Sequence, residues 1–144
     1  MKIIISNDHA ATELKKQIME HLKNYEVTDI GSDSGNSDYP KYAASAAKAV
    51  AKGEYSLGIL ICGTGAGMCI AANKIRGIRA VVCSEPTTAR LSREHNNAQI
   101  LCLGARVVGA ELAKEIVDAF IGASFQGGRH QPRVEMLMAL EQVE

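Results

Sequence analysis

The sequence predicts an α/β fold in which one parallel sheet is covered by helices on both faces, a doubly wound architecture. Short runs rich in Ile, Leu and Val alternate with longer segments of helical periodicity along the 144 residues, and this alternation is typical of βαβ units. A glycine-rich stretch joins the apolar run Leu57–Cys62 to a helix. No repeat, low-complexity tract or linker interrupts the pattern, so we expect residues 1–144 to form a single domain.

Five apolar runs are expected to form the strands. Leu57–Cys62 has the composition of a strand buried on both faces, and the N-terminal isoleucines also lead directly into a strand. In chain order, the expected strands are Lys2–Ser6, Glu26–Ile30, Leu57–Cys62, Ile78–Cys83 and Ile100–Leu103. For these five parallel strands we expect the flavodoxin-like (Rossmann-like) order 2-1-3-4-5.

Helices are expected between the strands. Leu14, Ile18 and Leu22 lie four residues apart on one helical face. Pro40 and Gly53 bound an alanine-rich segment, because proline suits the first turn of a helix and glycine ends one. The expected helices are Ala10–Lys23, Ala43–Lys52, Gly67–Ile75, Pro86–Glu94 and Glu111–Ile121, with an extra C-terminal helix that opens at Pro132. Residues 31–39 are polar and turn-rich, which predicts a loop.

Sheets of this kind bind ligands beyond the carboxyl ends of their strands, where the strand order reverses. In the expected order this point lies between the first and third strands. Asp8 and His9 follow the first strand, and Cys62 and Thr64 lie at the end of the third. The topology therefore predicts that these four side chains share one site.

Composition argues against several classes of function. The formal net charge is +0, which gives no global electrostatic basis for binding nucleic acid or an anionic membrane. No apolar run reaches the length of a membrane span and the N-terminus lacks a signal-peptide pattern, so we expect a cytoplasmic protein. None of the four cysteines forms a C-x-x-C pair, which argues against zinc and thioredoxin-type chemistry. Cys83 and Cys102 lie in apolar runs and are expected to be small buried hydrophobes.

The stretch Gly63–Gly67 predicts an anion-binding loop. Glycines let the main chain approach a ligand, and the free N–H groups of the first helical turn point at it. Cys62 directly precedes these donors, which favours a nucleophile or base; the alternative is a buried cysteine at a strand end. Cys69 is the competing candidate, although it lies within the next helix, beyond the donors. The sequence G-T-G-A-G matches neither G-x-G-x-x-G nor a Walker A motif, so it gives little support for nucleotide binding.

Two polar clusters are further candidates for ligand binding. The pair Asp8-His9 follows the first strand, although Asp8 also suits the cap of the next helix. The segment Glu94–Asn97 lies between a helix and the fifth strand, for which a solvated loop is the ordinary explanation. The expected topology places this segment nearer the amino ends of the strands, away from the predicted site.

Three arginines are candidate anion ligands. Arg129 and Arg133 stand about one helical turn apart at a helix start, where the helix dipole disfavours cations. Anion binding would explain them, because guanidinium groups and free N–H groups converge there, and the alternative is a solvated basic turn. Arg106, just after the fifth strand, is the third.

Together these motifs resemble the type B ribose-5-phosphate isomerases, in the family that also holds the allose-6-phosphate and galactose-6-phosphate isomerases. The resemblance runs nearly end to end. It is carried by Asp8-His9, Asp38-Tyr39-Pro40, ICGTGAGMCIAANK from Ile61, GIRAVVCSEP from Gly77, EHNN from Glu94, LGARVVG from Leu103 and GGRHQPRVE from Gly127. It implies an aldose–ketose isomerase that acts on a sugar phosphate through a cis-enediolate, without a metal or other cofactor.

The resemblance also implies residue roles. Family members carry the base either as a cysteine at the position of Cys62 or as a glutamate at the position of Met68, and this chain has only the cysteine. His95 is expected to assist ring opening, and Thr64 is a candidate proton relay between the two sugar oxygens. The expected sugar contacts are Asp8, His9, Tyr42, Asn96, Gly63, Thr64, Gly65, Ala66 and Gly67, and the expected phosphate ligands are Arg106, Arg129 and Arg133.

The family resemblance further implies a homodimer, with assembly to a tetramer left open, whose active sites lie at the interface and use both subunits. Three alternatives remain. In the first, the substrate is a six-carbon sugar phosphate, and the depth of the pocket would decide between five and six carbons. In the second the chain is a non-catalytic sugar-phosphate or nucleotide-binding domain, although a pure binder needs no base. In the third, oxidation of Cys62 controls a partner.

Overall fold

The computed structural model describes residues 1–33, 35 and 38–142, so part of the loop predicted over residues 31–39 lies outside the described residues. The strands are β1 (Lys2–Asn7), β2 (Glu26–Asp29), β3 (Leu57–Cys62), β4 (Ala80–Val82) and β5 (Ile100–Gly104). The helices are α1 (Thr12–His21), α2 (Tyr39–Ala51), α3 (Ala66–Asn73), α4 (Pro86–Asn96), α5 (Ala110–Ile121) and α6 (Gln131–Ala139), and the 3-10 turns are η1 (His9–Ala11), η2 (Gly128–His130) and η3 (Leu140–Gln142). The predicted strands and helices are confirmed, with ends that shift by a few residues.

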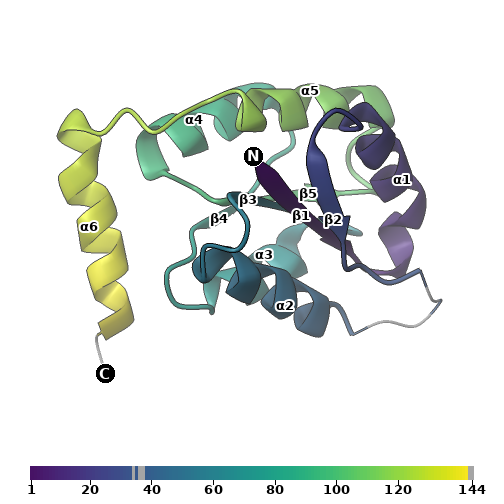
Figure 1. Ribbon diagram of the computed structural model, residues 1–144, viewed down its shortest axis with the longest axis horizontal. Helices are drawn as coiled ribbons and strands as arrows, with labels where there is room; N and C mark the ends of the chain where they lie inside the picture. The colour runs from purple at the N-terminus through teal and green to yellow at the C-terminus, as the bar shows by residue number, and fades with distance from the viewer. Residues whose placement is uncertain (34, 36–37, 143–144) are drawn as a thin grey trace.

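Helices cover both faces of the sheet, as predicted. Figure 1 shows α1, α4 and α5 on one side of the strands and α2 and α3 on the other. Ile3 and Ile5 of β1 belong to the apolar cluster on the first side, which includes the fully buried Phe120, whereas Ile4 belongs to the cluster on the second. Alternate side chains of a strand point to opposite faces, so one run of isoleucines contributes to both cores.

The strand order is β2-β1-β3-β5-β4, and the predicted order 2-1-3-4-5 is wrong in its second half. β5 pairs in parallel with β3, and Cys62 lies opposite Gly104. All five residues of β5 are buried, whereas β4 has only three residues and leaves Val82 45% exposed. A fully apolar strand gains most from the centre of a sheet, and a short strand suits the edge.

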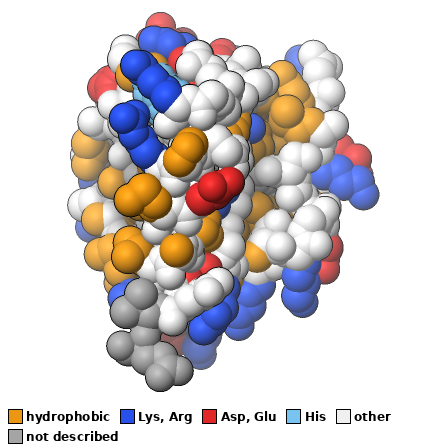
Figure 2. Space-filling model, turned by 90° about the vertical axis from the view of Figure 1, so that its left-hand side faces the viewer, with side chains coloured by type: hydrophobic (Ala, Val, Ile, Leu, Met, Phe, Trp, Pro, Cys, Tyr) orange, Lys and Arg blue, Asp and Glu red, His pale blue; other side chains and the backbone are white. Residues whose placement is uncertain are grey.

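Helix α6 stands apart from the two helical layers (Figure 1). Val134 is its buried residue, and Met136, Leu137 and Leu140 at and after its last turns expose 69%, 46% and 66% of their surface. Figure 2 shows hydrophobic side chains gathered along the face that carries α6, beside basic side chains. Apolar side chains exposed together in this way mark an interaction surface. Among the described residues, no helix is long and apolar enough to cross a bilayer.

Candidate active site

A cavity of about 260 Å³ lies beyond the carboxyl ends of β1 and β3, at the predicted point of reversal. β1 and β3 are neighbours, with Asn7 opposite Ile61, so the loops that follow them meet there. We call this cavity the cysteine cavity. Its lining residues are Asp8, Tyr39, Cys62, Gly63, Thr64, Gly67 and Arg106. The structure therefore brings Asp8, Cys62 and Thr64 together as the topology predicted.

Cys62 closes β3 and is 5% exposed. The main-chain N–H of Gly65 donates a hydrogen bond to its Sγ at 3.2 Å. Gly65 has a left-handed φ of 84°, which turns the chain back toward the end of the strand and precedes the first turn of α3. The loop therefore holds the sulfur at the end of the strand, where Cys62 lines the cavity.

Two N–H groups of the glycine loop donate hydrogen bonds within the loop itself. Besides the bond from Gly65 to sulfur, the N–H of Ala66 donates to Thr64 Oγ1 at 3.2 Å. These two donors are engaged within the loop. The loop is therefore preorganised around Cys62, and Gly63, Thr64 and Gly67 are its members that line the cavity.

Arg106 reaches the cysteine cavity because β5 lies beside β3. The N–H of Ala105 donates to the carbonyl of Cys62 at 2.8 Å, and the N–H of Arg106 donates to the carbonyl of Gly63 at 2.9 Å. A Cβ atom built on Gly63 would meet Arg106 Nη1 at 3.2 Å, so the guanidinium lies directly over this residue. The incorrect strand order could not have placed this cation beside Cys62.

A tyrosine that the sequence reasoning did not assign also lines the cavity. The ring of Tyr39 lies against Gly67, where a Cβ atom would come within 2.5 Å of Tyr39 Cε1. Tyr42, the predicted sugar contact, lies one turn further along α2 and packs against the apolar cluster on that face of the sheet. The Asp38-Tyr39-Pro40 motif was the signal that pointed to Tyr39.

Asp8 and His9 have different surroundings. Asp8 lines the cavity, and its Oδ1 also accepts a hydrogen bond from the N–H of Ala10 at 2.9 Å. Both predicted roles, ligand contact and helix cap, are therefore compatible with its position. His9 begins η1, is exposed, and is not among the lining residues.

The other predicted site residues gather at the opposite end of the sheet. Helix α4 carries His95 and ends at Asn96, just before β5 begins at Ile100, and the strand then runs to Gly104 opposite Cys62. Four strand residues at ~3.3 Å each separate these two levels by roughly 13 Å. Within one chain, His95 and Asn96 therefore lie away from the cysteine cavity.

The ring of His95 stacks on that of His130, with centroids 4.1 Å apart and an interplanar angle of 13°. Loss of hydration, followed by the charges of His95 and of the two neighbouring arginines, lowers the pKa of His130. We call these four residues, His95, Arg129, His130 and Arg133, the histidine–arginine cluster. The sequence reasoning missed His130, although it stands between the two assigned arginines. Cationic donors concentrated in this way favour an anion such as a phosphate.

The remaining cysteines are not in the cysteine cavity. Cys83 and Cys102 are 2% and 0% exposed, which confirms the prediction of small buried hydrophobes. Burial raises the pKa of the Cys83 thiol to about 11 and that of Cys102 well above its usual value. Cys69 donates to the carbonyl of Ala80 at 3.5 Å, on the β4 side of α3, and its hydrogen bond with Cys102 lowers its pKa. Within the described part of the chain, no three His, Cys, Asp or Glu side chains are grouped to hold a metal ion.

Residues 3–137 match the model of the Ribose/Galactose Isomerase family. The chain belongs to this family. Ribose-5-phosphate isomerase B of Escherichia coli (strain K12) is 57% identical over 144 residues, a match that covers 98% of this chain and 97% of that protein. D-erythrulose-4-phosphate isomerase of Pectobacterium atrosepticum is 46% identical, with 100% and 97% covered.

Solved structures of the Ribose/Galactose Isomerase family agree with the fold. Ribose-5-phosphate isomerase B of Clostridium thermocellum superposes with a TM-score of 0.96 at 51% identity, covering 99% of this chain and 98% of that one. The Mycoplasma genitalium enzyme with bound ribulose-5-phosphate gives a TM-score of 0.94 at 44% identity, covering 99% and 97%. The resemblance seen in the motifs is confirmed, and the chain is an aldose–ketose isomerase of this family.

Proposed function

We propose that this isomerase interconverts ribose 5-phosphate and ribulose 5-phosphate through a cis-enediolate, with Cys62 as the base. The hydrogen bond from Gly65 N–H to Cys62 Sγ carries the proposal, because it holds the sulfur in place in a cavity that Arg106 also lines. The Escherichia coli relative and the Mycoplasma genitalium structure, named for this sugar and its ketose, support the choice of substrate.

The proposed reaction begins with the open-chain aldose. The Cys62 thiolate takes the proton from C2, the C2–H electron pair forms the C1–C2 double bond, and negative charge moves to O1. The thiol then returns the proton to C1 while O2 loses its own proton and becomes the ketone. Thr64 lines the cavity and is proposed to relay the proton between O1 and O2. One donor to such a developing oxyanion contributes about 2.7–4 kcal/mol in a comparable enzyme site, and the N–H groups of Thr64 and Gly67 are the proposed donors.

We also propose that the active site forms between two copies of the chain. The cysteine cavity holds a base but only one of the three predicted phosphate ligands, and the other two belong to the histidine–arginine cluster at the far end of the sheet. Each end also carries exposed apolar side chains, Val82 and Val107 near the cavity and Met136 and Leu140 on the α6 side. A twofold dimer that joins unlike ends buries these surfaces and completes two sites at once.

The substrate is tested by one assay with purified protein in EDTA. Ribose 5-phosphate, erythrulose 4-phosphate, allose 6-phosphate and galactose 6-phosphate are offered side by side. We expect the highest kcat/KM with ribose 5-phosphate and no loss of rate in EDTA. A higher value with a four-carbon or six-carbon sugar phosphate would reassign the substrate, and a strict metal requirement would contradict the mechanism. Erythrulose 4-phosphate is included because a relative at 46% identity carries that name.

Arg133→Ala is expected to raise KM for ribose 5-phosphate about 10- to 100-fold, with kcat changed much less. The reason is that a hydrogen bond to a charged group contributes about 1.5–3 kcal/mol, and a phosphate remote from the reacting carbons contributes equally to ground and transition states. Steady-state kinetics measure the split. Arg76→Ala, in an exposed loop after α3, is the control. A fall in kcat alone would show that Arg133 is not a simple phosphate ligand.

Gly104→Ala is expected to lower kcat about 100-fold in a folded protein. A Cβ atom at Gly104 would lie 2.6 Å from the main-chain oxygen of Thr64, so the glycine loop must move, and a ~1 Å displacement of reacting groups costs about that factor. Gly109→Ala is the matched control, since nothing lies within 4 Å of its new Cβ. Unchanged turnover in Gly104→Ala would mean that the loop position does not control the chemistry.

A further inference from the structure

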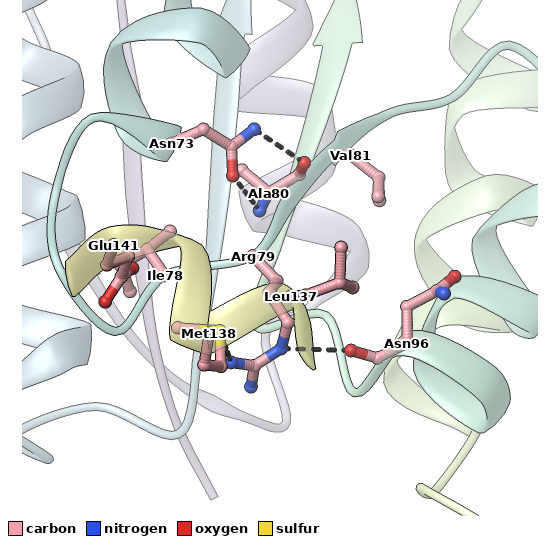
Figure 3. Close-up of a pocket in the computed structure, with 9 residues that line it drawn as sticks. All are labelled: Asn73, Ile78, Arg79, Ala80, Val81, Asn96, Leu137, Met138 and Glu141. Atoms are coloured by element: carbon pink, nitrogen blue, oxygen red, sulfur yellow. Dashed lines mark hydrogen bonds between the residues drawn. The ribbon is translucent and has the colours of Figure 1, made fainter. Parts of the chain in front are cut away.

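Arg79 lies between α3 and β4, in neither of the two site halves described above. Its half-buried side chain lines a cavity of about 320 Å³ between β4 and the C-terminal segment. Figure 3 shows its guanidinium between the end of α4, marked by Asn96, and α6, marked by Leu137 and Met138. A half-buried guanidinium in this position can join two elements through its hydrogen bonds.

The first set of contacts joins Arg79 to the end of α4. Its Nε donates to the carbonyl of Asn96 at 2.9 Å and to that of Asn97 at 3.1 Å, and its Nη2 donates to the carbonyl of Asn97 at 2.9 Å. Asn97 has a left-handed φ of 50° and ends the helix. The final carbonyls of a helix carry its negative dipole end and lack partners within the helix. One guanidinium therefore satisfies the two carbonyl acceptors that directly follow His95.

The second set joins the same segment to the C-terminal helices. Arg79 Nη1 lies 2.9 Å from Met138 Sδ, and the N–H of Gly77 donates to Glu141 Oε1 at 2.9 Å. Burial lowers the pKa of the Arg79 guanidinium, and the charge of Glu141 acts in the opposite direction. The main chain of Arg79 is also held beside β5, because its N–H donates to Oε1 of Gln99, the residue before that strand, at 2.7 Å.

The contacts of Arg79 with α4 do not involve the side chains of His95 and Asn96. Arg79 binds the main-chain carbonyl of Asn96, and in Figure 3 the Asn96 side-chain amide points away from the guanidinium. His95, the preceding residue, stacks on His130, which directly precedes α6. The two elements that carry the histidine–arginine cluster are thus joined by two contacts, the ring stack and the Arg79 side chain.

We propose that Arg79 is a positioning residue of the isomerase, which holds the end of α4 against α6 and so fixes His95 and Asn96 relative to Arg133. The proposal rests on the function proposed above for these residues. Arg79 reaches no atom of the cysteine cavity lining and acts through main-chain carbonyls, so its effect on turnover is indirect. Neither lysine nor methionine can reproduce it, because the contacts need a planar fork with several N–H donors.

The test compares Arg79→Lys and Arg79→Met with Arg76→Met, an exposed arginine of the same connection. Each variant is assayed for kcat and KM with ribose 5-phosphate, and its thermal midpoint is recorded. We expect kcat to fall at least about tenfold in both Arg79 variants, because misplacement of catalytic groups by ~1 Å has effects of this order or larger. Arg76→Met is expected to match the wild type. Guanidinium ion added to Arg79→Met is expected to restore part of kcat, which a general loss of folded protein would not allow.

A readout independent of activity is the NMR titration of the His130 ring. Reduced hydration and His95 hold the pKa of His130 below its ordinary value of 6.5. If Arg79 fixes α4 against α6, this pKa rises toward 6.5 in Arg79→Met and stays low in Arg76→Met. An unchanged His130 pKa together with wild-type kcat in a folded Arg79→Lys protein would overturn the proposal.

The two proposals fail in different ways. Absence of turnover in the wild type would overturn the proposed reaction, and normal turnover in Cys62→Ala would overturn its proposed base. In both cases the His130 titration would still report whether Arg79 holds the two helices. Turnover in the wild type with a lower thermal midpoint but unchanged kcat in the Arg79 variants would reduce Arg79 to a stabilising contact, and the positioning role would be overturned alone.

Discussion

Cys62→Ala is expected to abolish isomerisation, with a loss of about 10³-fold or more in kcat, because general base catalysis by one positioned group contributes about 10²–10⁴-fold. The cavity offers no second thiol, since Cys69, Cys83 and Cys102 lie outside its lining. Removal of one sulfur from a nearly buried position leaves the backbone intact, so the circular dichroism spectrum should match that of the wild type. The measurement is kcat with saturating ribose 5-phosphate.

Cys69→Ala is the matched control, because Cys69 follows the same glycine loop but donates to Ala80 on the β4 side of α3. It should retain most of the activity. Near-normal turnover in Cys62→Ala would remove Cys62 as the base, and an equal loss in both variants would point to a structural effect of either sulfur rather than to proton transfer.

Two inactive variants are expected to restore activity when they form one dimer. Cys62→Ala and His95→Ala each damage both sites of their own homodimer. If a site takes Cys62 from one chain and His95 from the other, the mixed dimer has one intact site and one doubly damaged site. Purified mixed dimers should then reach about half of the wild-type rate, and a random mixture about a quarter, by the arithmetic of twofold symmetry.

The experiment co-expresses the two variants with different affinity tags and isolates the doubly tagged dimer. Cys62→Ala carrying both tags is the control and should stay inactive. If both groups acted within one chain, every site of the mixed dimer would lack one of them and no rate would return. A monomeric wild-type protein in sedimentation velocity would contradict the shared site before any mixing.

The sequence predicted the helices, the strands and the meeting of β1 and β3, because apolar periodicity and glycine loops are local signals. It did not predict that β5 lies between β3 and β4, since strand order depends on how completely each strand is buried in the assembled sheet. The short β4, with exposed Val82, and the fully buried β5 show this only in three dimensions.

The candidate site was also predicted only in part. Asp8, Cys62 and Thr64 follow from topology and lie together. Tyr39 was not predicted, although its ring lies over Gly67, and Tyr42, one helical turn further on, stays a predicted sugar contact that is partly buried against the apolar cluster. The predicted distance of His95 from the reversal point is confirmed by the end of α4 beside the start of β5. The stacking of His130 on His95 could not be predicted, because the apolar periodicity of α6 does not show where this helix packs.

The separation of the cysteine cavity from the histidine–arginine cluster has a consequence for rate as well as for shape. Under the proposed assembly, a single chain holds two half-sites and no complete site, so it would turn over substrate only when it is paired with a second chain. Below the dissociation constant of the pair, the population of dimers varies with the square of total protein. Dilution would then switch the enzyme off without unfolding it, and substrate that bridges two chains would draw them back together.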